Sequence, residues 1–186
     1  FGDPTGEITS FSIPILENTP GLAQAGIGQF DVKATPLQMA LVAAAVSNDG
    51  LIMKPYIVDS YKTETTEATK INKPEVWKST LPSEIARSLK FAMETIVKNG
   101  TANRMQVAGA VIGGKTGTAQ VDSSRPDDTH GWVIGFAGPK EGPSTVAIAV
   151  LVESIPEKGQ NTGGSDAAPI AQIVLEETLR IQGYID

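Results

Sequence analysis

Residues 113–120 read Gly-Gly-Lys-Thr-Gly-Thr-Ala-Gln. One cation, two hydroxyl side chains and three glycines stand within these eight residues. Glycine inside a strand pattern often marks a place where a ligand or another backbone comes close. Packing alone gives no reason for so much glycine in a strand, so we take this stretch as the first candidate for a functional site. Its local structure also decides the fold.

Two functions use such a string, and they require opposite local structures. Residues 109–116 fit G-x-x-x-x-G-K-[ST], the phosphate-binding loop of nucleotide hydrolases, which runs directly into a helix. Read from Lys115, the letters Lys-Thr-Gly-Thr fit the K-T-G element of active-site serine acyltransferases. That second element lies on a strand.

The residues after Lys115 favour the strand. Gly117, Thr118 and Val121 would have to form the first turn of the phosphate-binding helix, and all three are poor helix formers. In a strand, alternation puts Lys115 and Gly117 on one face and Thr116 and Thr118 on the other. An exposed edge there can pair with a substrate backbone as an added strand, while its cation and hydroxyls meet an anionic group.

Three segments in the second half of the chain predict an antiparallel sheet. Residues 114–121, 131–137 and 144–153 carry the apolar or alternating patterns of strands. We expect residues 122–130 to form a polar loop and residues 139–143 to form a turn. Loops of about 5 to 10 residues suit a meander of antiparallel strands rather than crossovers through helices.

Helical patterns flank these strands. Thr35-Pro36 is an N-cap signal, and the apolar residues that follow to position 48 predict a helix buried on all faces. A second helix is predicted from about residue 83 to Asn99-Gly100, and a third from Ser165-Asp166 to near Gly183. The expected fold class is α/β of the α+β type, with an antiparallel sheet sandwiched between helices.

Two further regions predict little regular structure. Residues 1–34 are rich in glycine, proline, serine and asparagine, so we expect turns and loops there. Residues 51–80 predict a solvated hairpin or excursion. The chain starts with Phe1 rather than Met, and we interpret residue 1 as a cut in a longer chain.

Composition excludes several functions. The net charge is −6, and no basic run tracks a phosphate backbone, so we expect no nucleic-acid partner. The chain has no cysteine and a single histidine, which argues against disulfides, thiolate chemistry and a metal centre. No apolar run reaches the roughly 18 residues that cross a bilayer. We expect no cofactor.

A few residues invite a functional interpretation that we do not adopt. His130 is expected to be a turn residue rather than a general base, because the sequence places no acid or hydroxyl near it. Trp132 and Phe136 share strand parity and are expected in the core. The pair Asp127-Asp128 is expected to be solvated.

Several short motifs stand in a fixed order along nearly the whole chain. They are Gly26-Ile27-Gly28-Gln29, Ala34-Thr35-Pro36-Leu37-Gln38-Met39-Ala40, Asn99-Gly100-Thr101-Ala102, Gly114-Lys115-Thr116-Gly117-Thr118-Ala119, Gly131-Trp132-Val133-Ile134-Gly135-Phe136, and Gly163-Gly164 with Ala167-Ala168-Pro169. In this series the chain resembles the C-terminal part of the transpeptidase domain of class B penicillin-binding proteins, the serine acyltransferases that cross-link peptidoglycan.

The resemblance implies a serine acyl-enzyme mechanism on stem peptides ending in D-Ala-D-Ala, with β-lactams as substrate mimics. It implies that Lys115 supplies positive potential and hydrogen bonds beside the nucleophile and takes part in binding the substrate. The hydroxyls of Thr116 and Thr118 would hold the terminal carboxylate, and Gly117 would leave room for it. The backbone N–H of Thr118 would form half of an oxyanion hole. Lys115 and Thr118 are thus the expected catalytic residues.

One departure from the family pattern limits this expectation. The family also needs S-x-x-K, which holds the nucleophile, and S-x-N, and neither occurs in residues 1–186. We expect both in an upstream portion, on the same protein or on a separate chain, so that residues 1–186 form the C-terminal portion of one transpeptidase domain. The expected location is the extracytoplasmic face of the bacterial membrane. A D,D-carboxypeptidase and a non-catalytic β-lactam sensor remain alternatives.

Overall fold

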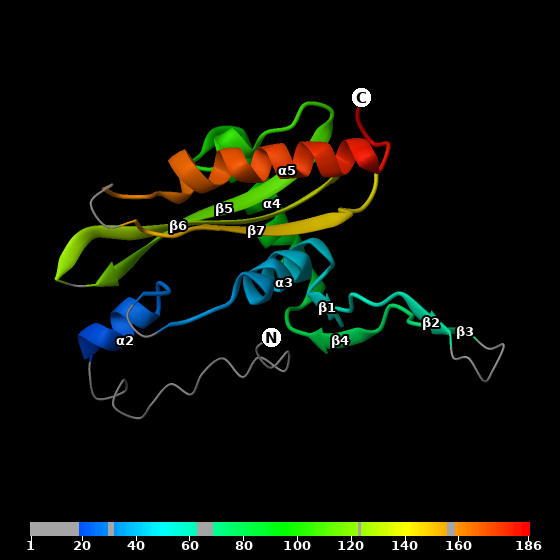
Figure 1. Cartoon of the computed structure of the whole chain (residues 1–186), viewed down its shortest axis with the longest axis horizontal. Coiled ribbons are helices and arrows are strands. Elements are labelled where there is room, and N and C mark those ends of the chain that lie inside the picture. Colours follow the sequence, from blue (N-terminus) through cyan, green and yellow to red (C-terminus); the bar gives the residue numbers. More distant parts are fainter. Residues whose placement is uncertain (1–18, 30–31, 63–68, 123, 156–158) are drawn as a thin grey trace.

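An antiparallel three-stranded sheet organises the molecule. The computed structural model describes residues 19–29, 32–62, 69–122, 124–155 and 159–186. Strands β5 (Ala110–Asp122), β6 (Arg125–Pro139) and β7 (Val146–Val152) pair in the order β5-β6-β7 (Figure 1). The meander predicted from the loop lengths is therefore confirmed, and so is the α/β fold class with helices on both sides of the sheet.

Helices cover both faces of this sheet. α3 (Pro36–Ser47) packs on one face and α5 (Ala168–Ile181) on the other (Figure 1). α4 (Ser83–Asn99) passes beside β5 and takes part in the cores on both faces. The smaller core contains Val46, Met93 and Phe136, and the larger core gathers α5 and the sheet around Val97 and Met105. Both faces of the sheet are thus covered by helices, as expected.

The N-terminus of α3 forms as its sequence predicts. The Thr35 hydroxyl accepts a hydrogen bond from the Gln38 backbone N–H at 3.2 Å, and the Gln38 side chain accepts from the Thr35 N–H at 2.8 Å. This reciprocal capping box satisfies two donors that a helix start leaves free. The helix is not buried on all faces, because Leu37 is 54% exposed and Val42 is 45% exposed.

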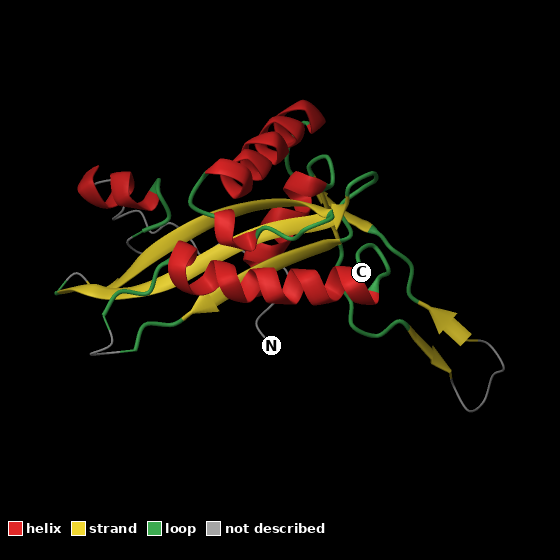
Figure 2. Cartoon of the chain, turned by 90° about the horizontal axis from the view of Figure 1, so that it is seen from above, coloured by secondary structure: helices red, strands yellow, loops and turns green. Residues whose placement is uncertain are grey.

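An excursion separates α3 from α4, as the sequence predicts. Strand β1 (Leu51–Met53) pairs with β4 (Val76–Ser79), and β2 (Ser60–Lys62) pairs with β3 (Thr69–Ile71), both antiparallel. The β2–β3 pair projects away from the large sheet (Figure 2). None of the helices in the described part of the chain is long and apolar enough to cross a membrane.

Two short elements escape prediction from the sequence. A seven-residue helix, α2 (Thr19–Ala25), forms where glycine and proline predict turns. The rest of the predicted N-terminal turn region, residues 1–18 and 30–31, lies outside the described residues. The predicted C-terminal helix begins with a π-helical turn, η2 (Gly163–Ala167), whose N-cap is Thr162 rather than Ser165.

The polar segment 122–130 is the largest error, because most of it is strand rather than loop. β6 begins at Arg125, and its pairing with β5 continues to Asp122, with a register irregularity after Gln120. Tertiary contacts hold these polar residues in the sheet. The Thr129 side chain is buried, and its hydroxyl donates to the Asn161 carbonyl at 2.8 Å.

The other polar residues of this segment are also held. His130 is a strand residue and not a turn residue, and its Nδ1 accepts from the Ser154 N–H at 2.8 Å. Asp128 forms an ion pair with Arg125 at 2.8 Å, and its side chain is only 13% exposed, so it is not simply solvated. Asp127 accepts a hydrogen bond from Gln160 at 3.0 Å.

The glycines of β5 serve different purposes, and the expectation that packing gives no reason for them is wrong for two. A Cβ on Gly113 would lie 2.1 Å from the Phe136 ring, and one on Gly114 would lie 2.5 Å from the Met105 sulfur. At Gly117 the nearest atom would be the Trp132 Cβ at 3.4 Å, an ordinary contact. Internal packing therefore requires glycine at 113 and 114 but not at 117.

This difference gives a prediction about stability. Gly113→Ala should lower the free energy of unfolding by about 1 to 3 kcal/mol, since the Phe136 ring must move or strain. Gly117→Ala should change it by no more than about 0.5 kcal/mol. Urea unfolding of the two variants beside the unmodified protein measures both values. Equal losses at the two positions would contradict the packing described for β5.

Candidate active site

The site is built on the free edge of β5, and this edge pairs with no other strand in the described part of the chain. β5 is the terminal strand of its sheet and pairs on one side with β6. On its other side the Gln29 side chain donates to the Thr118 carbonyl at 2.9 Å and accepts from the Gln120 N–H at 3.3 Å. In an antiparallel ladder, the N–H and C=O of one residue point to the same edge. The Thr118 N–H therefore points outward as well.

Lys115 and Gly117 lie on the α3 side of the sheet. Their cross-strand partners are Ile134 and Trp132. Together with residues 27–29 and Met39 these side chains line a largely apolar pocket of about 510 Å³. Lys115 is exposed, and its Nζ donates to the Thr116 carbonyl. Of the residues lining the pocket it is the one that carries a positive charge. Trp132 lines this pocket and is not fully in the core, whereas Phe136 is completely buried.

Thr116 lies on the opposite face, as the alternation predicts. Its hydroxyl lies 2.7 Å from the hydroxyl of Thr101, which follows α4. These two threonines, Thr118 and the Thr162–Gly164 turn line a second pocket of about 330 Å³. Residues 116–118 line both pockets and so form the rim between them. All four predicted residues, Lys115 to Thr118, therefore line at least one of the two pockets.

The turn at the start of η2 packs against strands β5 and β6. A Cβ on Gly163 would lie 2.1 Å from the Trp132 carbonyl and 2.8 Å from the Gly117 backbone, so only glycine allows this close approach. Asp166 holds the turn: it accepts hydrogen bonds from the Ser165 hydroxyl and from the Thr162 N–H, the latter at 2.7 Å. The Ser165 hydrogen bond, then the Thr162 N–H and the Arg104 charge, hold the pKa of Asp166 below its usual 3.8 against partial desolvation.

Three contributors escaped the residue-level prediction. Gln29, Thr101 and Thr162 contact the β5 edge or line its pockets. Gln29 and Thr101 belong to short motifs whose order is visible in the sequence, but nothing local assigns them a partner. Thr162 precedes a glycine pair, and no other feature of the sequence indicates that it lines the site.

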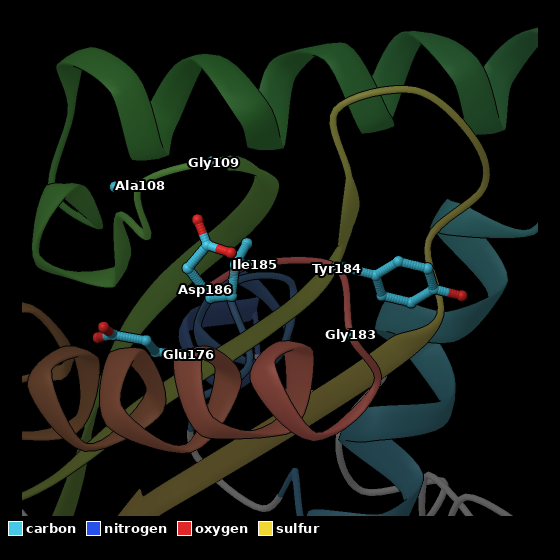
Figure 3. Close-up of a pocket in the computed structure, with 7 residues that line it drawn as sticks. All are labelled: Ala108, Gly109, Glu176, Gly183, Tyr184, Ile185 and Asp186. Atoms are coloured by element: carbon cyan, nitrogen blue, oxygen red, sulfur yellow. The ribbon is translucent and has the colours of Figure 1, made fainter.

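A third pocket lies at the opposite end of β5 and has a different character. It has a volume of about 450 Å³ and is lined by Ala108-Gly109, by Glu176 of α5 and by residues 183–186 (Figure 3). The Glu176 and Asp186 carboxylates make it acidic, and Tyr184 points away from Glu176. None of the residues predicted for the site lines this pocket.

The nucleotide-binding alternative fails on the structure. A phosphate-binding loop needs a helix directly after the lysine, whose free N–H groups hold the phosphates. Residues 115–122 continue as strand β5. The strand alternative for the Lys-Thr-Gly segment is therefore the correct one.

The sequence as a whole matches a known family and curated proteins. The family described as the penicillin binding protein transpeptidase domain matches residues 3–176. A peptidoglycan D,D-transpeptidase PbpA from Mycolicibacterium smegmatis is 36% identical over 176 residues, which cover 90% of this chain and 35% of that protein. Stage V sporulation protein D from Bacillus subtilis is 33% identical over 184 residues, covering 95% of this chain and 28% of that protein.

Solved structures share the fold. The crystal structure of PBPA from Mycobacterium tuberculosis has a TM-score of 0.73 at 34% identity, over 86% of this chain and 38% of that one. A penicillin G acyl-enzyme complex of penicillin-binding protein A from the same organism has a TM-score of 0.71 at 35% identity, over 86% of this chain and 35% of that one. The chain thus spans about a third of the length of these relatives.

The Asp166 contacts give a prediction about acid stability. Because the folded-state pKa of Asp166 lies below 3.8, the stabilisation from its carboxylate is present above pH 3.8 and is lost as the pH falls through the folded-state pKa. Asp166→Asn should therefore lower the free energy of unfolding near neutral pH, and the difference from the unmodified protein should shrink in acid. Ser165→Ala should give a smaller change in the same direction. Urea unfolding at several pH values measures this, and a difference independent of pH would contradict it.

Proposed function

The chain belongs to the penicillin-binding protein transpeptidase domain family, and on this premise we propose that it forms the Lys-Thr-Gly wall of a peptidoglycan D,D-transpeptidase. Named relatives that are 32% to 36% identical over nearly the whole chain carry that activity in their names. The activity of the whole protein stays a proposal, because these relatives are about three times as long.

The observation that carries the proposal is the outward direction of the Thr118 N–H at a free strand edge. A donor in that position can stabilise the oxyanion that forms when a nucleophile attacks a carbonyl carbon, and loss of one such donor costs about 3 to 4 kcal/mol in related chemistry. Lys115 lies three residues away on the same strand and adds positive charge to the site. We propose Lys115 and Thr118 as catalytic residues.

Thr116, Gly117 and Thr118 are proposed to hold the substrate. The hydroxyls of Thr116 and Thr118 can donate to the terminal carboxylate of a stem peptide. Gly117 keeps the rim between the two pockets free of a side chain, and internal packing does not require glycine there. A reason outside the chain, such as the close approach of a substrate backbone, accounts for it.

The proposed reaction has two steps. A serine oxygen attacks the carbonyl carbon of the penultimate D-Ala, the C–N bond breaks, and D-Ala leaves with a proton on its nitrogen. The amine of a neighbouring stem peptide then attacks the ester carbonyl carbon and forms a new amide. The ester C–O bond breaks, and the amine gives one of its own protons to the serine oxygen. A β-lactam follows the first step, because its strained amide opens onto the same serine.

The serine itself is proposed to lie outside residues 1–186. No serine in this sequence is followed by lysine three positions on, and no S-x-N occurs. We propose that these residues are the C-terminal portion of one transpeptidase domain, completed by the upstream part of the protein or by a second chain. The proposed partners are peptidoglycan stem peptides and β-lactams, and the proposed location is the extracytoplasmic face of the membrane.

Labelling by a fluorescent penicillin tests the function. We expect the full-length protein to be labelled covalently, and mass spectrometry should find the label on a serine outside these residues. Labelling of any serine within them would overturn the assignment of Lys115 to Thr118 as one wall of the site. A full-length protein that is not labelled would refute the proposed function.

Two lysine substitutions test whether Lys115 is a catalytic residue. Lys115→Ala should reduce the rate of penicillin acylation by roughly 100-fold or more, since it removes the positive charge that Lys115 adds to the proposed site. The melting temperature should stay within a few degrees, because the side chain is exposed. Lys140→Ala, an exposed lysine in the turn after β6, is the matched control and should acylate normally. An unchanged rate for Lys115→Ala would remove it from the catalytic set.

A further inference from the structure

Gln29 contacts the proposed oxyanion strand over a long sequence separation. Its side-chain amide bonds to Thr118 and Gln120, which lie 89 and 91 residues further along the chain. It donates to the carbonyl of one residue and accepts from the N–H of the residue two positions on. A residue of an adjoining parallel strand makes the same pair of bonds. The Gln29 side-chain amide therefore makes the two hydrogen bonds that one residue of a neighbouring parallel strand would make.

The backbone around Gln29 aims this amide. Helix α2 ends at Ala25, and Gly28 adopts a φ of 77°, which glycine reaches without steric cost. The Gln29 backbone N–H donates a hydrogen bond to the Gln24 carbonyl at 3.0 Å. Among the described residues, no atom lies within 4 Å of a Cβ placed on Gly28, so the positive φ rather than a lack of space explains this glycine. The helix end thus fixes the starting point of the Gln29 side chain.

Gln29 also determines which backbone N–H and carbonyl groups on the β5 edge remain available to a ligand. The Thr116 carbonyl accepts a hydrogen bond from the Lys115 ammonium. The Thr118 carbonyl accepts one from the Gln29 side chain, and the Gln120 N–H donates one to it. The next outward donor towards the start of the strand is the Thr118 N–H. The Gln29 bonds restrain the residues that immediately follow this N–H, beside a register irregularity between Gln120 and Asp122 that weakens the hold of β6.

We propose that Gln29 is a positioning residue for the transpeptidase site: its amide fixes the edge from Thr118 to Gln120 and so aims the Thr118 N–H at the developing oxyanion. This inference rests on the proposed function. It implies that Gln29 acts in the transition state through Thr118 and contributes little to ground-state binding, because a donor that meets the oxyanion gains its full strength only as the charge forms.

Acylation kinetics of the full-length protein separate this role from a structural one. Stopped-flow mixing with a fluorescent penicillin yields three quantities: the rate constant of acylation at saturation, the dissociation constant of the complex before acylation, and the amplitude, which counts folded active protein. Gln29→Leu leaves an apolar side chain that is one bond shorter, and it removes both hydrogen bonds. Gln29→Glu keeps an acceptor for Gln120 but loses the donor to Thr118.

We expect Gln29→Leu to lower the saturating rate constant by about 10- to 100-fold, the range that a misplacement of about 1 Å produces. The dissociation constant and the amplitude should stay within about twofold. Gln29→Glu should lose at least as much rate near neutral pH, because a carboxylate repels the Thr118 carbonyl oxygen. Gln24→Leu makes the same change at an exposed glutamine on α2. Gln24 contacts Gln29 through its backbone carbonyl, which the substitution keeps, so this variant should acylate normally.

Each other outcome overturns the proposal. An unchanged rate constant removes Gln29 from the site. A tighter dissociation constant would identify Gln29 as a competitor for the groups that substrate needs. A lower amplitude with a normal rate constant would make its role structural. If the unmodified full-length protein is not labelled by penicillin, the proposed function has failed, and that result is distinct from all of these.

Discussion

The free edge of β5 is the constraint on which the rest of the site depends. An edge strand directs every second N–H and C=O away from its sheet, and each such group needs a partner or water. Close to the glycine-rich stretch, side chains meet part of this need: Lys115 pairs with one carbonyl, and Gln29 pairs with the next outward carbonyl and with the N–H that follows. The Thr118 N–H lies between them. The chemistry of the site therefore follows from which backbone groups the chain pairs by itself and which it leaves open.

The glycines of β5 show how one residue type meets two demands within a single strand. Gly113 and Gly114 lie where Phe136 and Met105 press on opposite faces of the sheet, and both cores need that space. Gly117 has no such neighbour and lies at the rim of both pockets. Tight packing around Gly113 and Gly114 holds that part of β5 rigid. A rigid strand can offer the Gly117 backbone to a ligand at a fixed position, with no side chain between them.

Local patterns in the sequence predict the elements, and long-range contacts decide the rest. The capping signal at Thr35-Pro36, the periodicity of α4 and the apolar run of β7 depend on neighbouring residues, so their positions follow from the sequence. The strand conformation of residues 125–130 depends on contacts such as Thr129 with Asn161, 32 residues away. The Gln29 contact spans 89 residues. No local pattern contains that information, so the sequence could indicate the glycine-rich stretch as a candidate site but could not indicate the residues that contact it.

The alternation of the strand sets a further condition on any ligand. Lys115 and Thr116 are neighbours on opposite faces, so a molecule confined to the larger pocket meets the cation but not Thr101 or Thr162. One confined to the smaller pocket meets the hydroxyls but not the cation. Both sets are reached only by a ligand that lies along residues 116–118, where the faces meet at the edge. A peptide backbone ending in a carboxylate has that shape, with its amides along the edge and its charge among the hydroxyls, and a compact nucleotide does not.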